Sequence, residues 1–163
     1  MKKKYAFLLF TISILGMVSC YKTPTYPDVP EIEFDDYTVL QPYTITDTGN
    51  LRIRFTDGDG DLGMVSNSDS GTQSKIFIYN IKYSLAGIPR NIPIIPQKGT
   101  TKAISGTIDV KLAGAGGIGL LDESACLLMQ HPLDTLTFRI YIQDRAGHKS
   151  NEIITPPLVV QCP

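Results

Sequence analysis

Apolar and polar residues alternate strictly in three stretches of the chain. The clearest stretch is 136–143, where Leu136, Phe138, Ile140 and Ile142 alternate with polar or amphipathic residues. The same period of two occurs at 51–55 and at 104–112. Because successive side chains of a strand point to opposite faces, each stretch is predicted to form a strand with one buried face.

Weaker patterns predict four further strands. The segment 76–85 is long and rich in aromatic and β-branched residues, and 153–160 is apolar but contains Pro156 and Pro157, which favour a sheet edge or a bulge. Shorter candidates lie at 32–34 and 92–95, while the best short helical pattern, 123–130, ends before Pro132. About seven strands separated by turn-forming residues predict an all-β fold, an immunoglobulin-like β-sandwich.

The first 20 residues have a different pattern. Three lysines at 2–4 precede an apolar run at 5–18, followed by Ser19 and Cys20. This order is typical of a secretory signal, and the run is too short to span a membrane. Residues 15–19 (LGMVS) resemble the bacterial lipobox, which implies a lipid on Cys20 as the first residue of the mature protein. The alternative is an ordinary signal peptide followed by a chance cysteine.

These patterns divide the chain into three parts: a signal peptide at 1–19, a lipidated Cys and Pro-rich tether at 20–31, and one folded domain at 32–163. Loss of the signal removes three lysines and changes the net charge from −1 to −4. The scattered basic residues of an acidic protein exclude a nucleic-acid-binding role, which needs clustered Lys and Arg. The lipid predicts attachment to the outer membrane, at the periplasmic face or the cell surface.

Three carboxylates follow the strand predicted at 51–55. Asp57, Asp59 and Asp61 alternate with glycines, and their mutual repulsion favours binding of a cation; Ca²⁺ prefers such oxygen ligands. The loop is not an EF-hand, because Leu62 and Ser68 occupy the sixth and twelfth positions, where that motif has Gly and Glu. The alternative is a solvated hairpin turn, since Asp-Gly pairs form turns without any metal.

The predicted topology adds two candidate metal ligands. In an immunoglobulin-like sandwich the second and sixth strands run in the same direction, so the loops after them open at one end. Asp144 would then lie near Asp57, and Asn151 would offer an amide oxygen. A competing account, compatible with the first, has Arg145 neutralise one of the acids.

Two segments carry a resemblance to a known group of proteins. FTDGDGDLG (55–63) and DTLTFRIYIQDRAGHKSN (134–151) together resemble small uncharacterised lipoproteins of Gram-negative bacteria, which join a lipobox, a DGDGD loop and a late strand ending in an Asp-Arg-Ala turn. The late segment is also similar to the last hairpin of bacterial immunoglobulin-like modules, with His148 in place of the usual Asn. The resemblance implies a sandwich and calcium but supplies no activity.

The remaining cysteines suggest a disulfide. Once Cys20 carries lipid, Cys126 and Cys162 form an even pair in an oxidising compartment. If 134–143 pairs antiparallel with 151–160, Cys162 comes to lie beside the start of the earlier strand, a short distance along the chain from Cys126. The alternative is two buried thiols.

Other motifs point away from catalysis. Gly114, Gly116 and Gly119 form a G-x-G-x-x-G pattern, but no helix of sufficient length follows, so no nucleotide site is predicted. His131 and His148 lie apart without a nearby Cys, and no Ser has a G-x-S-x-G context.

We therefore expect a membrane-anchored, non-catalytic immunoglobulin-like module, stabilised by calcium, that binds a protein or a glycan. The alternative is a carbohydrate-binding accessory lipoprotein of a surface polysaccharide system. Such a site offers exposed aromatic platforms, for which Tyr37, Tyr43, Tyr79 and Tyr83 are candidates.

Overall fold

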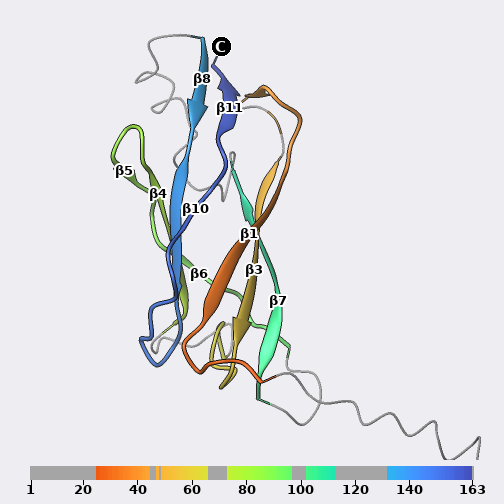
Figure 1. Cartoon of the computed structure of the whole chain (residues 1–163), viewed down its shortest axis with the longest axis vertical. Coiled ribbons are helices and arrows are strands. Elements are labelled where there is room, and N and C mark those ends of the chain that lie inside the picture. The colour runs from red at the N-terminus through yellow and green to blue at the C-terminus, as the bar shows by residue number, and fades with distance from the viewer. Residues whose placement is uncertain are drawn as a thin grey trace, which may run out of the picture.

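The computed structural model describes residues 25–44, 47, 49–65, 73–96, 102–112 and 132–162. Within these ranges every regular element is a strand, which confirms the predicted all-β fold (Figure 1). The strands are β1 (Glu31–Thr38), β2 (Tyr43–Thr44), β3 (Asn50–Asp57), β4 (Lys75–Asn80), β5 (Leu85–Ala86), β6 (Arg90–Asn91), β7 (Ile104–Lys111), β8 (Leu133–Leu136), β9 (Phe138–Gln143), β10 (Ile153–Ile154) and β11 (Leu158–Gln161).

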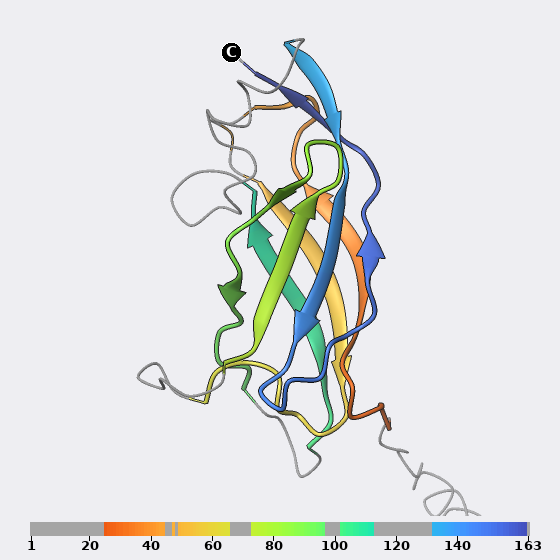
Figure 2. The same cartoon turned by 90° about the vertical axis from the view of Figure 1, so that its left-hand side faces the viewer.

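Two sheets face each other (Figures 1 and 2). One has the order β1-β3-β7, and the other has the order β10-β9-β4-β5 with β6 also paired to β4. A third, small sheet, β2-β11-β8, lies at the end that holds the C-terminus. Because β8 leads into β9 and β10 leads into β11, one long hairpin joins the second sheet to the third.

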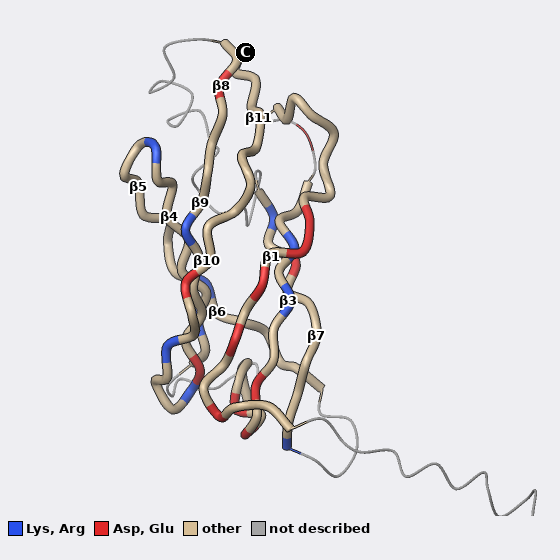
Figure 3. The backbone as a smooth tube through the Cα atoms, in the orientation of Figure 1, with Lys and Arg blue, Asp and Glu red and all other residues tan. Residues whose placement is uncertain are grey.

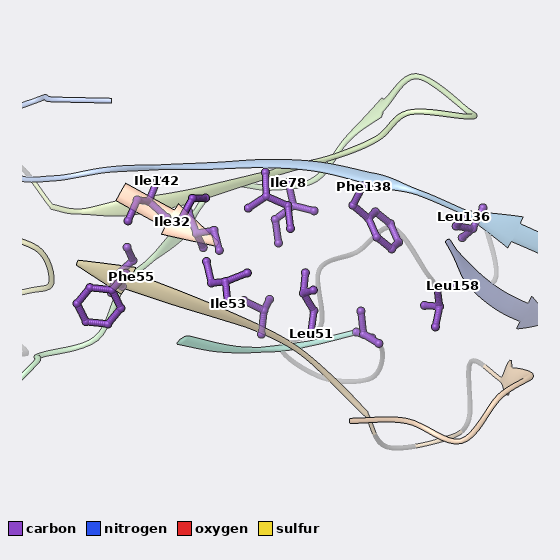
Figure 4. Packing of buried hydrophobic residues seen from close by; sticks show 14 of the residues in the cluster. Ile32, Leu51, Ile53, Phe55, Ile78, Leu136, Phe138, Ile142 and Leu158 are labelled. Atoms are coloured by element: carbon purple, nitrogen blue, oxygen red, sulfur yellow. The ribbon is translucent and has the colours of Figure 1, made fainter. Parts of the chain in front are cut away.

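The core lies between the two facing sheets (Figure 4). Strand β3 contributes Leu51, Ile53 and Phe55, and β9 contributes alternate residues from Phe138 to Ile142, as the period of two predicts. Each fully buried aliphatic or aromatic side chain contributes about 1.5–3 kcal/mol to folding. The sheets are therefore held together mainly by the stretches whose alternation is clearest.

The structure differs from the predicted strands where turns interrupt apolar stretches. The segment 76–85 divides into β4 and β5 around a four-residue turn, in which Ser84 has φ 52°. The segment 92–95 is not a strand, although Ile92 is buried; the short β6 precedes it. Strand β1 extends well beyond 32–34, with an irregularity between Phe34 and Asp36.

The C-terminal hairpin pairs antiparallel as predicted, with the expected register between β8 and β11 and a shift of one residue between β9 and β10. Ile153 pairs with Ile140, and Leu158 pairs with Leu136. Cys162 therefore lies beside the start of β8, and its amide donates a hydrogen bond to the carbonyl of Pro132 at 2.9 Å. Cys162 is disulfide-bonded. Its predicted partner Cys126 lies outside the described residues, as do Cys20, the short helical pattern, the glycine motif and His131.

Candidate metal centre

The acidic loop begins inside the sandwich. Leu51, Ile53 and Phe55 face the core along β3, and the same alternation turns the next such residue, Asp57, inward at the end of the strand. The Asp57 side chain is fully buried. One of its oxygens, Oδ2, accepts a hydrogen bond from the amide of Leu62 at 2.9 Å, which closes the loop on itself.

The loop turns on residues with left-handed backbone. Gly63 has φ 95°, and a Cβ there would lie 2.7 Å from the carbonyl oxygen of Pro93, so only glycine fits. The Gly63 amide donates to Ser74 Oγ at 2.9 Å. Within the loop, the Asp61 amide points to Asp59 Oδ1 at 3.4 Å. These contacts fix the path that brings alternate carboxylates to one side.

Asp57, Asp59 and Asp61 meet as a group. Each offers a carboxylate oxygen, and the three oxygens lie within 4.8 Å of one another. Asp57 Oδ1 and Asp61 Oδ1 are buried and accept no hydrogen bond from the described residues. Buried carboxylates are normally paired, hydrogen-bonded or bound to a metal. Three carboxylates gathered at this distance, two of them with a buried oxygen that lacks a donor, fit a hard divalent cation such as Ca²⁺.

The electrostatics of the group follow from burial and crowding. The pKa of Asp57 is raised to about 6, first by burial and then by the Asp59 and Asp61 carboxylates, against the lowering effect of the Leu62 amide. The pKa of Asp61 is also raised, by burial first and then by Asp144. A bound cation would remove this penalty, because it stabilises the charged form of each carboxylate.

The turn after β9 lies against the acidic loop, as the predicted topology requires. The Ala146 amide donates to Asp61 Oδ2 at 2.9 Å, and Arg145 Nη1 donates to the carbonyl of Gly63 at 2.8 Å. Among the described residues Arg145 forms no ion pair with a carboxylate. Its charge lowers the pKa of Asp61, but this effect is smaller than those of burial, Asp144, the Ala146 amide and Asp59. The acids are therefore not neutralised by Arg145 alone.

Asp144 and Asn151 have other partners. Asp144 is fully buried near Asp61, but Oδ1 accepts from the His148 amide at 2.7 Å and Oδ2 lies 2.9 Å from His148 Nδ1. Asn151 Oδ1 accepts from the Ile32 amide at 2.8 Å, and Asn151 Nδ2 donates to the Ile32 carbonyl at 2.9 Å. This amide side chain thus attaches β1 to the second sheet, which corrects the expectation that it would offer its oxygen to the ion.

Sequence reasoning missed two contributors to this region. One is Ser74, whose hydroxyl also lies 3.3 Å from the carbonyl of Asp61. The other is the tether, because the Gly58 amide donates to the carbonyl of Pro27 at 2.8 Å. The one sequence signal for such a close backbone approach is Gly58, which lies between two aspartates. This signal is ambiguous, because a glycine at that position also fits a simple turn.

The candidate tyrosines do not form an open platform. Tyr43 is buried, and the Tyr37 hydroxyl donates to Thr155 Oγ1 at 2.7 Å, with its pKa raised to about 12 by burial. The Tyr83 hydroxyl donates to Asp134. Tyr79 lies on the outer face of the second sheet, where it stacks at 6.2 Å with Tyr141.

Neighbouring groups cover the rings of that outer face. Phe77 stacks on Tyr141 with 4.6 Å between ring centroids and 12° between planes, and Lys149 Nζ lies 4.1 Å from the Tyr141 centroid. The Arg139 guanidinium lies 5.2 Å from the Tyr79 centroid. A sugar stacks on an uncovered ring face, so this arrangement does not favour the carbohydrate-binding alternative.

Among the described residues, no helix has the length and apolar character needed to cross a membrane.

Comparison with known proteins gives no relative. The chain matches no family model, no curated protein and no solved structure.

Proposed function

We propose that this chain is a membrane-anchored, non-catalytic lipoprotein module whose immunoglobulin-like β-sandwich is stabilised by calcium. The observation that carries the proposal is the meeting of Asp57, Asp59 and Asp61 at the end of β3, with Asp57 fully buried and its Oδ1 without a donor. A buried charge of this kind is costly unless a metal or a paired group offsets it.

The strand order supports the immunoglobulin-like assignment. If β1, β3 and β7 correspond to strands A, B and E, the facing sheet supplies C, F and G as β4, β9 and β10. Immunoglobulin-type sandwiches place A, B and E in one sheet and C, F and G in the other. This correspondence puts the loops after strands B and F side by side, where the acidic loop and the 144–150 turn meet.

A structural role for calcium follows from what the acidic loop contacts. The loop joins β3 to the tether through Gly58 and to the 144–150 turn through Asp61 and Gly63. Ca²⁺ takes six to eight oxygen ligands, to which three carboxylates contribute, whereas Zn²⁺ favours nitrogen and sulfur ligands that this loop lacks. Binding of Ca²⁺ would therefore fix the acidic loop, the tether and the 144–150 turn relative to one another.

The membrane attachment rests on the N-terminal pattern. A lipid on Cys20 would hold the mature, acidic domain at the outer membrane through the short tether. Labelling cells with radioactive palmitate tests this part of the proposal. We expect the label to be incorporated into the chain and to be lost in Cys20→Ala, and an unlabelled wild-type chain would contradict it.

Thermal unfolding tests the calcium site. Excess Ca²⁺ should raise the unfolding midpoint by several degrees relative to EGTA, because a ligand at about 100 times its Kd stabilises the native state by about 2.7 kcal/mol. Asp59→Ala should abolish the shift. Asp36→Ala is the matched control, since it removes an exposed acid outside the loop and should retain the shift. An identical midpoint in calcium and EGTA would refute the site.

A further inference from the structure

The tether lies directly against the acidic loop. The Gly58 amide donates to the Pro27 carbonyl at 2.8 Å, and a Cβ on Gly58 would lie 2.3 Å from the carbonyl oxygen of Tyr26. Only glycine permits this approach of two backbones. Acidic residues gather at the end of the molecule where the described chain begins (Figure 3). The tether and the candidate metal centre therefore share one end of the sandwich.

The length of the tether limits how far this end can lie from Cys20. Pro27 lies seven positions after Cys20 in the sequence. A fully extended chain spans at most about 3.6 Å per residue, so the two residues are at most about 25 Å apart. A lipid on Cys20 would keep the acidic loop within about 25 Å of the headgroups, whereas the opposite end of the sandwich could lie farther away by up to roughly the length of β1.

Three exposed apolar side chains belong to segments that contact or continue the same loop. Val29, Val65 and Ile94 are 44%, 63% and 43% exposed. Val29 follows the Pro27 contact by two residues, and Val65 follows Gly63 by two residues. Ile94 is adjacent to Pro93, whose carbonyl touches Gly63. All three side chains therefore lie near the acidic loop and in contact with water.

We propose that this end, defined by Val29, Val65, Ile94 and the acidic loop, is a surface that docks on the phospholipid bilayer. The inference rests on the proposed lipid and calcium. Exposed valine and isoleucine gain from transfer into the interface between headgroups and acyl chains. Bound calcium reduces the repulsion between the three carboxylates and anionic headgroups. Docking therefore depends on calcium, and it fixes the orientation of the domain instead of leaving it free on its tether.

A single tryptophan measures this docking, because the chain contains none. Val65→Trp places a probe at the tether end. Leu40→Trp is the matched control, since Leu40 is 87% exposed and follows β1 at the opposite end. Each lipidated mature variant is reconstituted into vesicles of phosphatidylglycerol and brominated phosphatidylcholine. With Ca²⁺ we expect the Val65→Trp fluorescence to be quenched several-fold more strongly than in EGTA and its emission to be blue-shifted. EGTA should reduce both effects. The Leu40→Trp fluorescence should remain unquenched in either condition.

Three results would overturn the inference. Equal quenching of the two probes would mean that this end has no preferred contact with lipid. If the Val65→Trp chain floats with the vesicles and keeps its calcium-dependent midpoint but is not quenched, the docking proposal alone is overturned. This is the result expected if the surface faces a protein instead of the bilayer. A chain that does not float, or that lacks the midpoint shift, would refute the anchor or the calcium site and the docking with it.

Discussion

Asp57 places a carboxylate at a core-facing position, and the burial of this one side chain is the main reason that the acidic loop favours a cation. Its orientation could be predicted from the sequence, because it continues the buried positions of β3 with the same period of two. Asp59 and Asp61 lie close to Asp57 because the three aspartates occupy alternate positions of one short loop. The contact of Asn151 with Ile32 could not be predicted, because it depends on where β1 lies relative to the second sheet, which no local pattern encodes.

The raised pKa of Asp57 predicts a pH dependence of the calcium-free protein. The pKa is about 6 in the folded state, against 3.8 for the unperturbed group, so the native state binds the proton more tightly than the unfolded state. The stabilisation from Asp57 is therefore complete below about pH 3.8 and is lost as the pH rises through about 6, a change of about 3 kcal/mol. Urea unfolding of chelator-treated protein between pH 4 and pH 8 measures it.

Asp57→Asn provides the comparison for this pH profile. The amide oxygen can still accept the Leu62 hydrogen bond, but the group no longer titrates. We expect a flatter profile and higher stability at pH 7 without calcium. An unchanged profile in the variant would assign the pH dependence to other groups, such as Asp61, whose pKa is raised in the same direction.

At the scale of elements, strands with strict alternation were predictable, and short or interrupted ones were not. Strands β3 and β7 follow the predicted stretches closely, whereas the stretch 136–143 is divided at Thr137 between the end of β8 and β9, which belong to different sheets. The two-residue β2 is too short to show a period, and its parallel pairing with β11 is a long-range feature. The apolar character of 76–85 hides the turn between β4 and β5, because Ile81 and Tyr83 lie in that turn instead of a strand.

Attachment of β1 to the second sheet through Asn151 is testable. Asn151→Ala leaves the Ile32 amide and carbonyl without these partners, and an unsatisfied buried group costs about 1–3 kcal/mol. Urea unfolding should show this loss equally with calcium and with EGTA. Asn91→Ala, at an exposed position of β6, is the control and should change stability by less than about 0.5 kcal/mol.

The same variant distinguishes the two roles considered for Asn151. A normal stability in EGTA combined with a lost calcium-dependent shift would identify Asn151 as a metal ligand. It would contradict the role in attaching β1.

At the scale of the whole molecule, different restraints act at the two ends of the sandwich. The acidic loop and the tether meet at one end, and the Cys162 disulfide lies at the other, beside the start of β8. The segment from Leu133 to Gln143 runs between these ends, and ten residues of strand span about 33 Å. Because the two restraints act at opposite ends of this segment, they should act independently.

Independence predicts additive losses of stability. Cys162→Ser should cost about 2–4 kcal/mol, the usual effect of losing a native disulfide. Removing calcium from this variant should add the same loss as it does in the wild type, within about 0.5 kcal/mol, because distant sites without shared partners are additive. Urea unfolding of both proteins in calcium and in EGTA completes the cycle. A coupling above about 1 kcal/mol would show that the long β8–β11 hairpin transmits strain from one end to the other, and two separate transitions would show that the ends unfold independently.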